Sequence, residues 1–207
     1  NAYPYNYMIG SEAQRRDAVD YLKLSLEMAK EMGAEFVLTS PANGGYLATY
    51  DQLWGRLEKN IQELGDYAAK LEIKLVVEAL TPYESNFFTR ANDLVELFRR
   101  VDNPYVVGMC DIVPPFVQHE SIMAYFDKLG NKMDHMHIID GENGSDTHMI
   151  PGEGNIPIKE MLYEMKRIGY DKTATLELVT NYINEPRFYA KRAIDNMREL
   201  MAEAGIV

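Results

Sequence analysis

Apolar residues recur along this chain with two alternating periods, one typical of helices and one of strands. In long segments an apolar residue returns every three or four positions, as in residues 12–32 with Val19, Leu22 and Leu26. Short apolar runs such as Phe36-Val37-Leu38 follow them. The pattern predicts helices near 12–32, 50–71, 90–100, 119–129 and 156–168 and from Pro186 onward. It predicts strands at 36–40, 73–80, 105–111, 134–140 and 173–179.

Regular alternation of strands and helices is typical of a parallel sheet with helical crossovers. Such a sheet either stays open and doubly wound or closes into a (β/α)8 barrel. An open sheet usually carries a glycine-rich phosphate loop after its first strand, and Asn43-Gly44-Gly45 is too short to serve as one. A barrel instead requires functional residues at the carboxyl ends of several strands, and this chain has them. We therefore expect a (β/α)8 TIM barrel.

Four consecutive expected strands each carry one carboxylate or imidazole at or near the carboxyl end, namely Glu78, Asp111, His137 and Glu177. Because side chains alternate along a strand, Glu78 lies on the face opposite its apolar neighbours. Barrel strand ends converge on the axis, where three carboxylates without a counter-charge would be strongly unfavourable. A divalent cation removes that conflict, since three oxygen donors and one imidazole suit Mn²⁺, Co²⁺, Ni²⁺, Zn²⁺ or Mg²⁺. We predict one divalent metal ion at these residues.

Other polar residues near the expected strand at 134–140 receive different interpretations. His135 lies deeper in the strand, which favours a packed core histidine over a ligand. Asp140 has the opposite parity, which favours a helix-facing or capping role. A long loop follows with Asp146-Thr147-His148, and long loops on this face of a barrel tend to be functional. We expect His148 to contact substrate or metal.

Composition narrows the class of protein. A chain of 207 residues, 46% apolar, can bury one sizeable core, so we expect one domain over residues 1–207. Methionines such as Met28 and Met32 lie at helical core spacing and are interpreted as packing. No apolar run approaches the roughly 18 residues that cross a membrane. Cys110 is the only cysteine, which fits a cytoplasmic location, and the net charge of −11 argues against a nucleic-acid partner.

Several phrases distributed over the chain carry a family resemblance: Tyr3-Pro4-Tyr5-Asn6, Trp54-Gly55-Arg56-Leu57, Leu80-Thr81-Pro82-Tyr83, Ser145-Asp146-Thr147-His148, Ile150-Pro151-Gly152-Glu153-Gly154 and Asn184-Glu185-Pro186-Arg187. With them the chain resembles the xylose-isomerase-like sugar isomerases and epimerases. The resemblance implies a metal ion bound by Glu, Asp, His and Glu from four successive strands. These positions fall on the four residues singled out above, and the resemblance makes Glu78 and Glu177 the acid/base pair as well.

The activity that the resemblance implies is inversion at carbon 3 of a ketose, with fructoselysine as the expected substrate. Tagatose-type 3-epimerases place a histidine where this chain has Pro114 and an arginine where it has His148, which sets it apart from enzymes of simple free ketoses. We expect a small sugar substrate, no nucleic-acid or membrane partner, and a homo-oligomer.

Four alternatives stay open. An aldose–ketose isomerase of sugars or sugar phosphates, or a tagatose- or psicose-type 3-epimerase, would use the same metal ligands. A family-two apurinic endonuclease is also similar, through Asp146-x-His148 before Gly152-x-Gly154, but Pro114 and the acidic charge oppose it. The last alternative is a polyol-binding protein without turnover, which the intact glutamates disfavour.

Only five strand–helix units are visible, whereas a closed barrel needs eight. The chain starts at Asn1 without an initiator methionine, in what looks like the loop after a third strand. We therefore expect these residues to be the C-terminal five-eighths of a barrel, with three units preceding them. A gap is then expected between the strands at 36–40 and 173–179.

Overall fold

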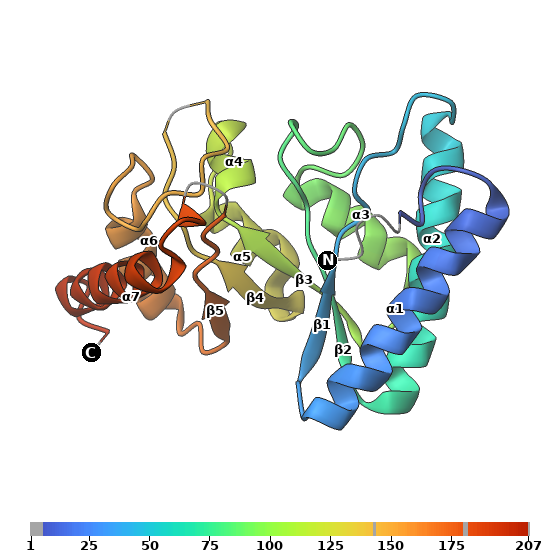
Figure 1. Ribbon diagram of the computed structural model, residues 1–207, viewed down its shortest axis with the longest axis horizontal. Coiled ribbons are helices and arrows are strands. Elements are labelled where there is room, and N and C mark those ends of the chain that lie inside the picture. The colour runs from blue at the N-terminus through green and yellow to red at the C-terminus, as the bar shows by residue number, and fades with distance from the viewer. Residues whose placement is uncertain (1–5, 143, 180–181, 207) are drawn as a thin grey trace. The chain divides into compact units, whose positions relative to one another are not determined.

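The computed structural model describes residues 6–142, 144–179 and 182–206; of the phrases above, Tyr3-Pro4-Tyr5 lies outside them. Its helices are α1 Glu12–Met32, α2 Tyr50–Leu71, α3 Ala91–Arg100, α4 Val113–Val117, α5 Met123–Leu129, α6 Ile158–Ile168 and α7 Pro186–Glu203, with a 3-10 turn η1 at Gly130–Lys132. Its strands are β1 Phe36–Thr39, β2 Lys74–Val77, β3 Val106–Asp111, β4 Met133–His137 and β5 Thr173–Thr175. Figure 1 shows them alternating along the chain.

The strands form one sheet in which spatial order follows chain order, β1-β2-β3-β4-β5. Parallel strands added in sequence, each followed by a helix, are the arrangement of a TIM barrel. The chain therefore has a TIM-barrel-like α/β fold, as the alternation of periods predicted. Within the described residues β1 and β5 stand at the two ends of this order. Two compact units are distinguished, Asn1–Met109 with Lys128–Asp134, and Cys110–Asp127 with His135–Val207.

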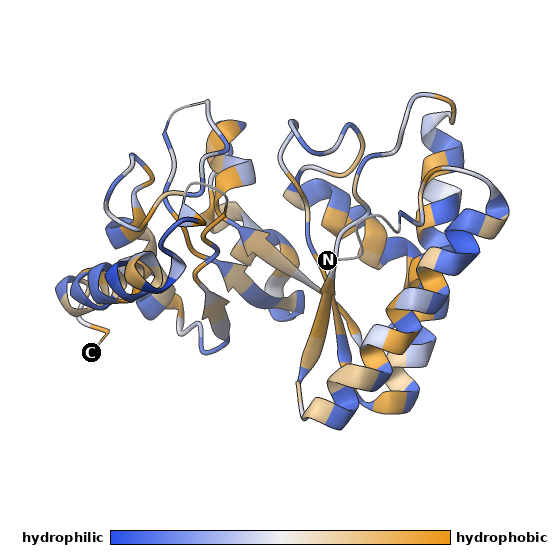
Figure 2. Cartoon of the chain, viewed as in Figure 1, coloured by the Kyte–Doolittle hydropathy of each residue, from blue (hydrophilic) through white to orange (hydrophobic). Residues whose placement is uncertain are grey.

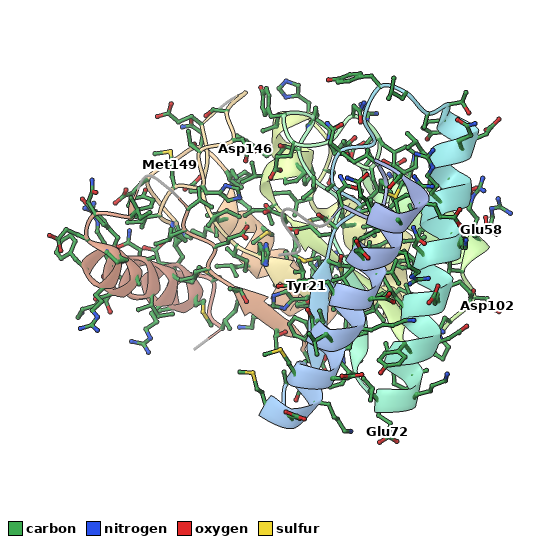
Figure 3. All side chains as sticks on the ribbon, turned by 45° about the vertical axis from the view of Figure 1, so that its right-hand side comes forward. Tyr21, Glu58, Glu72, Asp102, Asp146 and Met149 are labelled. Carbon is green, nitrogen blue, oxygen red and sulfur yellow. The ribbon has the colours of Figure 1, made fainter. Side chains whose placement is uncertain are left out.

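In the first unit, helices α1 and α2 lie side by side (Figures 1 and 3). Each begins at a capping box, Ser11 with Gln14 and Thr49 with Gln52, which satisfies amide groups that have no partner inside the helix. In Figure 2 both helices carry an apolar stripe beside a hydrophilic surface. The stripe of α2 is buried as the sequence predicted, and it consists of Leu53, Leu57, Ile61, Leu64 and Ala68.

The parallel register of the first unit sets the level of each strand end. Thr39 pairs with Val77, and Val77 pairs with Gly108. One residue beyond that pairing, the backbone N–H of Glu78 still donates to the carbonyl of Thr39 at 3.0 Å. Glu78 therefore follows directly on the carboxyl end of β2.

Some boundaries differ from those that the sequence predicts. The strands expected at 73–80 and 173–179 end at Val77 and Thr175. The helix expected at 119–129 starts only at Met123, and the short helix α4 before it was not predicted. Pro114 and Pro115 lie in the first turn of α4, where the missing N–H of proline costs nothing.

The interpretation of Met28 and Met32 as core packing is wrong. Their exposed fractions are 54% and 81%, because α1 buries the stripe of Ala18, Val19 and Leu22 instead.

None of the helices among the described residues is both long and apolar enough to cross a membrane.

Two glycines of α2 differ in their surroundings, and alanine at each should have opposite effects on stability. A Cβ at Gly65 would lie 2.5 Å from Cγ2 of Val106 and 3.1 Å from Nδ2 of Asn103, whereas one at Gly55 meets nothing within 4 Å. Gly65→Ala should lower the free energy of unfolding, because overpacking costs about 1–3 kcal/mol. Gly55→Ala should raise it by about 0.5–1 kcal/mol. Urea unfolding measures both, and stabilisation by Gly65→Ala would contradict the packing described.

Candidate metal centre

Three of the residues predicted as metal ligands come together in the second unit. Asp111 is the last residue of β3, His137 is the last residue of β4, and Glu177 follows two residues after β5. Asp111 and His137 are buried and Glu177 is partly exposed. One donor atom of each lies within 4.8 Å of the others.

The distances show a tight cluster. Nδ1 of His137 lies 3.1 Å from Oε2 of Glu177 and 3.7 Å from Oδ2 of Asp111. His148, which the sequence placed at substrate or metal, reaches the same two oxygens. Its Nε2 lies 3.4 Å from Oδ2 of Asp111 and 3.4 Å from Oε2 of Glu177. The structure therefore places His148 beside two of the four expected ligands, Asp111 and Glu177.

Asp111 is oriented by the turn that follows β3. Its Oδ1 accepts a hydrogen bond from the backbone N–H of Val113 at 2.8 Å, within the first turn of α4. The other oxygen, Oδ2, is the one that approaches His137 and His148. One carboxylate thus accepts a hydrogen bond from the first residue of α4 and serves the cluster at the same time, which fixes its orientation.

His135 is a structural residue, as its depth in the strand indicated. Its Nδ1 is 2.7 Å from Oγ1 of Thr173, and its Nε2 is 3.1 Å from Oγ1 of Thr175. Both ring nitrogens therefore contact hydroxyl groups of β5. This pairing links β4 to β5 and leaves His137 as the histidine of the cluster.

The pKa values of Glu177 and His148 indicate that the cluster stabilises a positive charge beside its carboxylates. Burial opposes the carboxylate form of Glu177, but hydrogen bonds with His137 and His148 hold its pKa well below the ordinary value. Burial also opposes the charged form of His148. Hydrogen bonds with Asp111 and Glu177, together with the charge of Asp146, nevertheless raise the pKa of His148 to about 10.

The donor set fits a divalent metal ion. Carboxylate oxygens and a neutral imidazole nitrogen are ligands of Zn²⁺, Mn²⁺ and similar ions. A cation would also provide the positive charge that the clustered oxygens of Asp111 and Glu177 favour. The residues present in the second unit therefore suit the group that the sequence predicted.

Glu78, the fourth expected ligand, belongs to the first unit. It is a buried carboxylate directly after β2. Its participation in the metal centre stays a prediction.

Asp146 was given no separate role from the sequence, yet its Oδ1 lies 3.5 Å from Nδ1 of His148. The Asp-x-His spacing was the signal for this contact. With the aspartate on one ring nitrogen and the cluster at the other, His148 is held from both sides.

The family model described as xylose isomerase-like TIM barrel matches residues 1–200. The chain belongs to this family of proteins, as the motifs and the strand order indicated. Fructoselysine 3-epimerase of Shigella flexneri is 47% identical over 203 residues, which cover 98% of this chain and 74% of that protein. These findings make the chain an enzyme of the sugar isomerase and epimerase class.

Solved structures share the fold of this chain. The crystal structure of a D-tagatose 3-epimerase-like protein superposes with a TM-score of 0.81 at 22% identity, covering 97% of this chain and 74% of that one. The crystal structure of the IOLI protein with a bound zinc atom has a TM-score of 0.77 at 19% identity, covering 96% and 73%. At these identities the likeness concerns the fold.

Replacement of Asp111 by asparagine should weaken metal binding. The amide oxygen can still accept from Val113, but the amide nitrogen then points at the cluster, where a donor cannot bind a cation. We expect the affinity for Zn²⁺ or Mn²⁺ to fall at least about 10-fold, as even outer-shell changes do. Calorimetric titration of metal-stripped full-length protein measures it, with Asp127→Asn, at an exposed position of α5, as control. Equal affinities for the two variants would remove Asp111 from the ligand set.

Proposed function

We propose that this chain is a metal-dependent ketose 3-epimerase that interconverts fructoselysine and psicoselysine. The observation that carries the proposal is the 47% identity to fructoselysine 3-epimerase over 98% of the chain. The cluster of Asp111, His137 and Glu177 supports the chemistry, because it supplies a metal site and a carboxylate base at one place.

The proposed metal ligands are Glu78, Asp111, His137 and Glu177. Support for Glu78 comes from the register of the sheet. Since Val77 pairs with Gly108, continuing the parallel register sets Glu78 at the level of Met109, two residues before Asp111 on the neighbouring strand. When bound, a divalent ion polarises the carbonyl of a ketose and stabilises negative charge on the adjacent oxygens.

The two glutamates are proposed to move the proton at carbon 3. Inversion requires that a proton leaves one face of the substrate and returns to the opposite face, so it needs two bases that approach from different sides. Glu78 and Glu177 follow strands that are far apart in the order of the sheet, β2 and β5. One carboxylate removes the proton from carbon 3, and the carboxylic acid of the other delivers one to the resulting enediolate.

His148 is proposed as a substrate contact. Its ring lies beside Asp111 and Glu177, and a ring N–H can donate a hydrogen bond to a sugar oxygen. The family resemblance implies an arginine at this position in tagatose-type 3-epimerases. An imidazole is shorter and makes fewer hydrogen bonds than a guanidinium, which leaves room for a ketose with a substituent.

Three further properties are proposed for the intact enzyme. The five units are part of an eight-unit barrel, since closure needs eight strands and the chain covers 74% of the Shigella flexneri relative. A reducing compartment such as the cytoplasm is supported by the single buried Cys110. Assembly into a homo-oligomer is a proposal that light scattering of the purified protein tests directly.

Incubation in D₂O tests the proposed function. With fructoselysine, full-length protein loaded with metal should introduce deuterium at carbon 3 and produce psicoselysine, followed by NMR. Fructose and tagatose should react more slowly. Deuterium at carbon 1 with formation of an aldose would instead indicate an isomerase. Absence of exchange with all three ketoses would exclude a 3-epimerase acting on these substrates.

Glu177→Gln should keep the size of the side chain but remove the base. We expect the rate of exchange at carbon 3 to fall at least about 100-fold. Because Glu177 is also a proposed ligand, bound metal is measured in the same samples by elemental analysis. Glu199→Gln on the exposed surface of α7 is the matched control and should exchange like the parent. A glutamine variant that retains metal and full exchange would remove Glu177 from the mechanism.

A further inference from the structure

The loop between β4 and α6 folds around one buried carboxylate, that of Asp140, whose exposed fraction is 1%. Three backbone N–H groups donate to it. Gly141 and Ile156 donate to Oδ1, each at 2.9 Å, and Gly152 donates to Oδ2 at 2.9 Å. The carboxylate therefore joins the start of the loop to two points near its end. We call the described residues of this segment, 141–142 and 144–156, the Asp140 loop.

Main-chain hydrogen bonds close the loop at the same place. The N–H of Asp140 donates to the carbonyl of Met149 at 2.8 Å, and the N–H of Met149 donates back at 2.6 Å. The N–H of Asn155 donates to the carbonyl of Gly141 at 2.8 Å. Asp146 and Met149 mark the loop in Figure 3. Asp140 is thus bound through both its side chain and its backbone, and Met149 is one of its direct partners.

The two glycines in Pro151-Gly152-Glu153-Gly154 follow from this arrangement. Gly152 presents its N–H to the carboxylate at a φ of +88°, a backbone conformation that residues with a side chain rarely adopt. A Cβ at Gly154 would lie 2.4 Å from Oδ1 of Asp140 and 2.5 Å from the carbonyl oxygen of Gly141. Any residue larger than glycine at 154 would push the carboxylate away from its donors.

His148 precedes Met149 and has a strained backbone. Its φ is +44°, in the left-handed region that is unfavourable for a residue other than glycine. Such a conformation persists only where the surrounding structure imposes it. The hydrogen bonds between Asp140 and Met149 provide that constraint on the adjacent residue. The strained backbone in turn directs the buried ring of His148 to Asp111 and Glu177.

We infer that Asp140 is a positioning residue for His148 in the proposed epimerase reaction. Its carboxylate holds the Asp140 loop in the one conformation that presents the imidazole of His148 to the cluster of Asp111, His137 and Glu177. This role rests on the proposed function for its effect on rate, whereas its effect on the loop is independent of any substrate. A displacement of about 1 Å at a contact residue can reduce a rate about 100-fold.

The informative variant is Asp140→Asn. An amide has one oxygen and one NH₂ group, so in either orientation at least one of the three backbone N–H groups faces a donor. Amide hydrogen exchange of the metal-free full-length protein should then accelerate at Gly152 or at Gly141 and Ile156, and at Met149. Glu142→Gln, an exposed acid in the same loop, is the matched control and should leave these amides unchanged.

A double-mutant cycle separates positioning from general stability. His148→Asn is the partner variant, since asparagine tolerates the left-handed conformation. Asp140→Asn alone should lower kcat/KM for the ketose about 10- to 100-fold with metal content retained. In the His148→Asn protein the same change should have little further effect, because residues that act through one contact are not additive.

Each result decides one point. The inference would be overturned if the fold-losses in kcat/KM of the two single variants multiply in the double variant. Full activity of Asp140→Asn would overturn it as well. If the parent enzyme introduces deuterium into none of the ketoses tested, the proposed function fails. The positioning role is then tested by amide hydrogen exchange alone. Unchanged protection of Met149 and of the three donor amides in Asp140→Asn would overturn that role as well, and faster exchange there would support it.

Discussion

Negative charge collected at the carboxyl ends of parallel strands is the constraint on which the centre of this protein depends. Parallel strands terminate at one edge, and here β3 and β5 end at Asp111 and near Glu177, whose oxygens both approach His137 and His148. Carboxylates in such a place are stable only beside positive charge. The same demand makes the cluster suitable for a cation and raises the pKa of His148, so the metal site and the adjacent histidine are consequences of one electrostatic requirement.

The loop after β4 meets a second requirement, that backbone groups away from water find hydrogen-bond partners. A carboxylate can accept several N–H groups at once, and Asp140 accepts three from a segment that has little regular structure. This explains how an irregular loop can hold one conformation. A precise position for His148 is therefore compatible with its location outside any helix or strand.

The sequence predicted the order of strands and helices and the clustering of Asp111, His137 and Glu177, because both depend on short-range periodicity. Alternation along a strand tells which face a residue occupies, and that was sufficient for these residues and for His135. Periodicity does not tell which neighbour covers a face, so Met28 and Met32 were placed in the core although α1 exposes them. It also gave no warning of α4, since two adjacent prolines usually indicate a loop. The triple hydrogen bond at Asp140 joins residues up to 16 positions apart and has no local signature.

Selectivity among ketoses should reside in the loops rather than in the sheet. The fold is shared with the D-tagatose 3-epimerase-like protein at a TM-score of 0.81 although only 22% of residues are identical, so the scaffold tolerates extensive substitution. A metal ligand at a strand end has little freedom to change without loss of the centre. His148 has more, since the main-chain hydrogen bonds between Asp140 and Met149 hold the adjacent backbone independently of the side chain at that position. Because the loop is held at Asp140, substitution at position 148 can change which sugar substituent the enzyme accepts. The chemistry at carbon 3 is preserved by such a change.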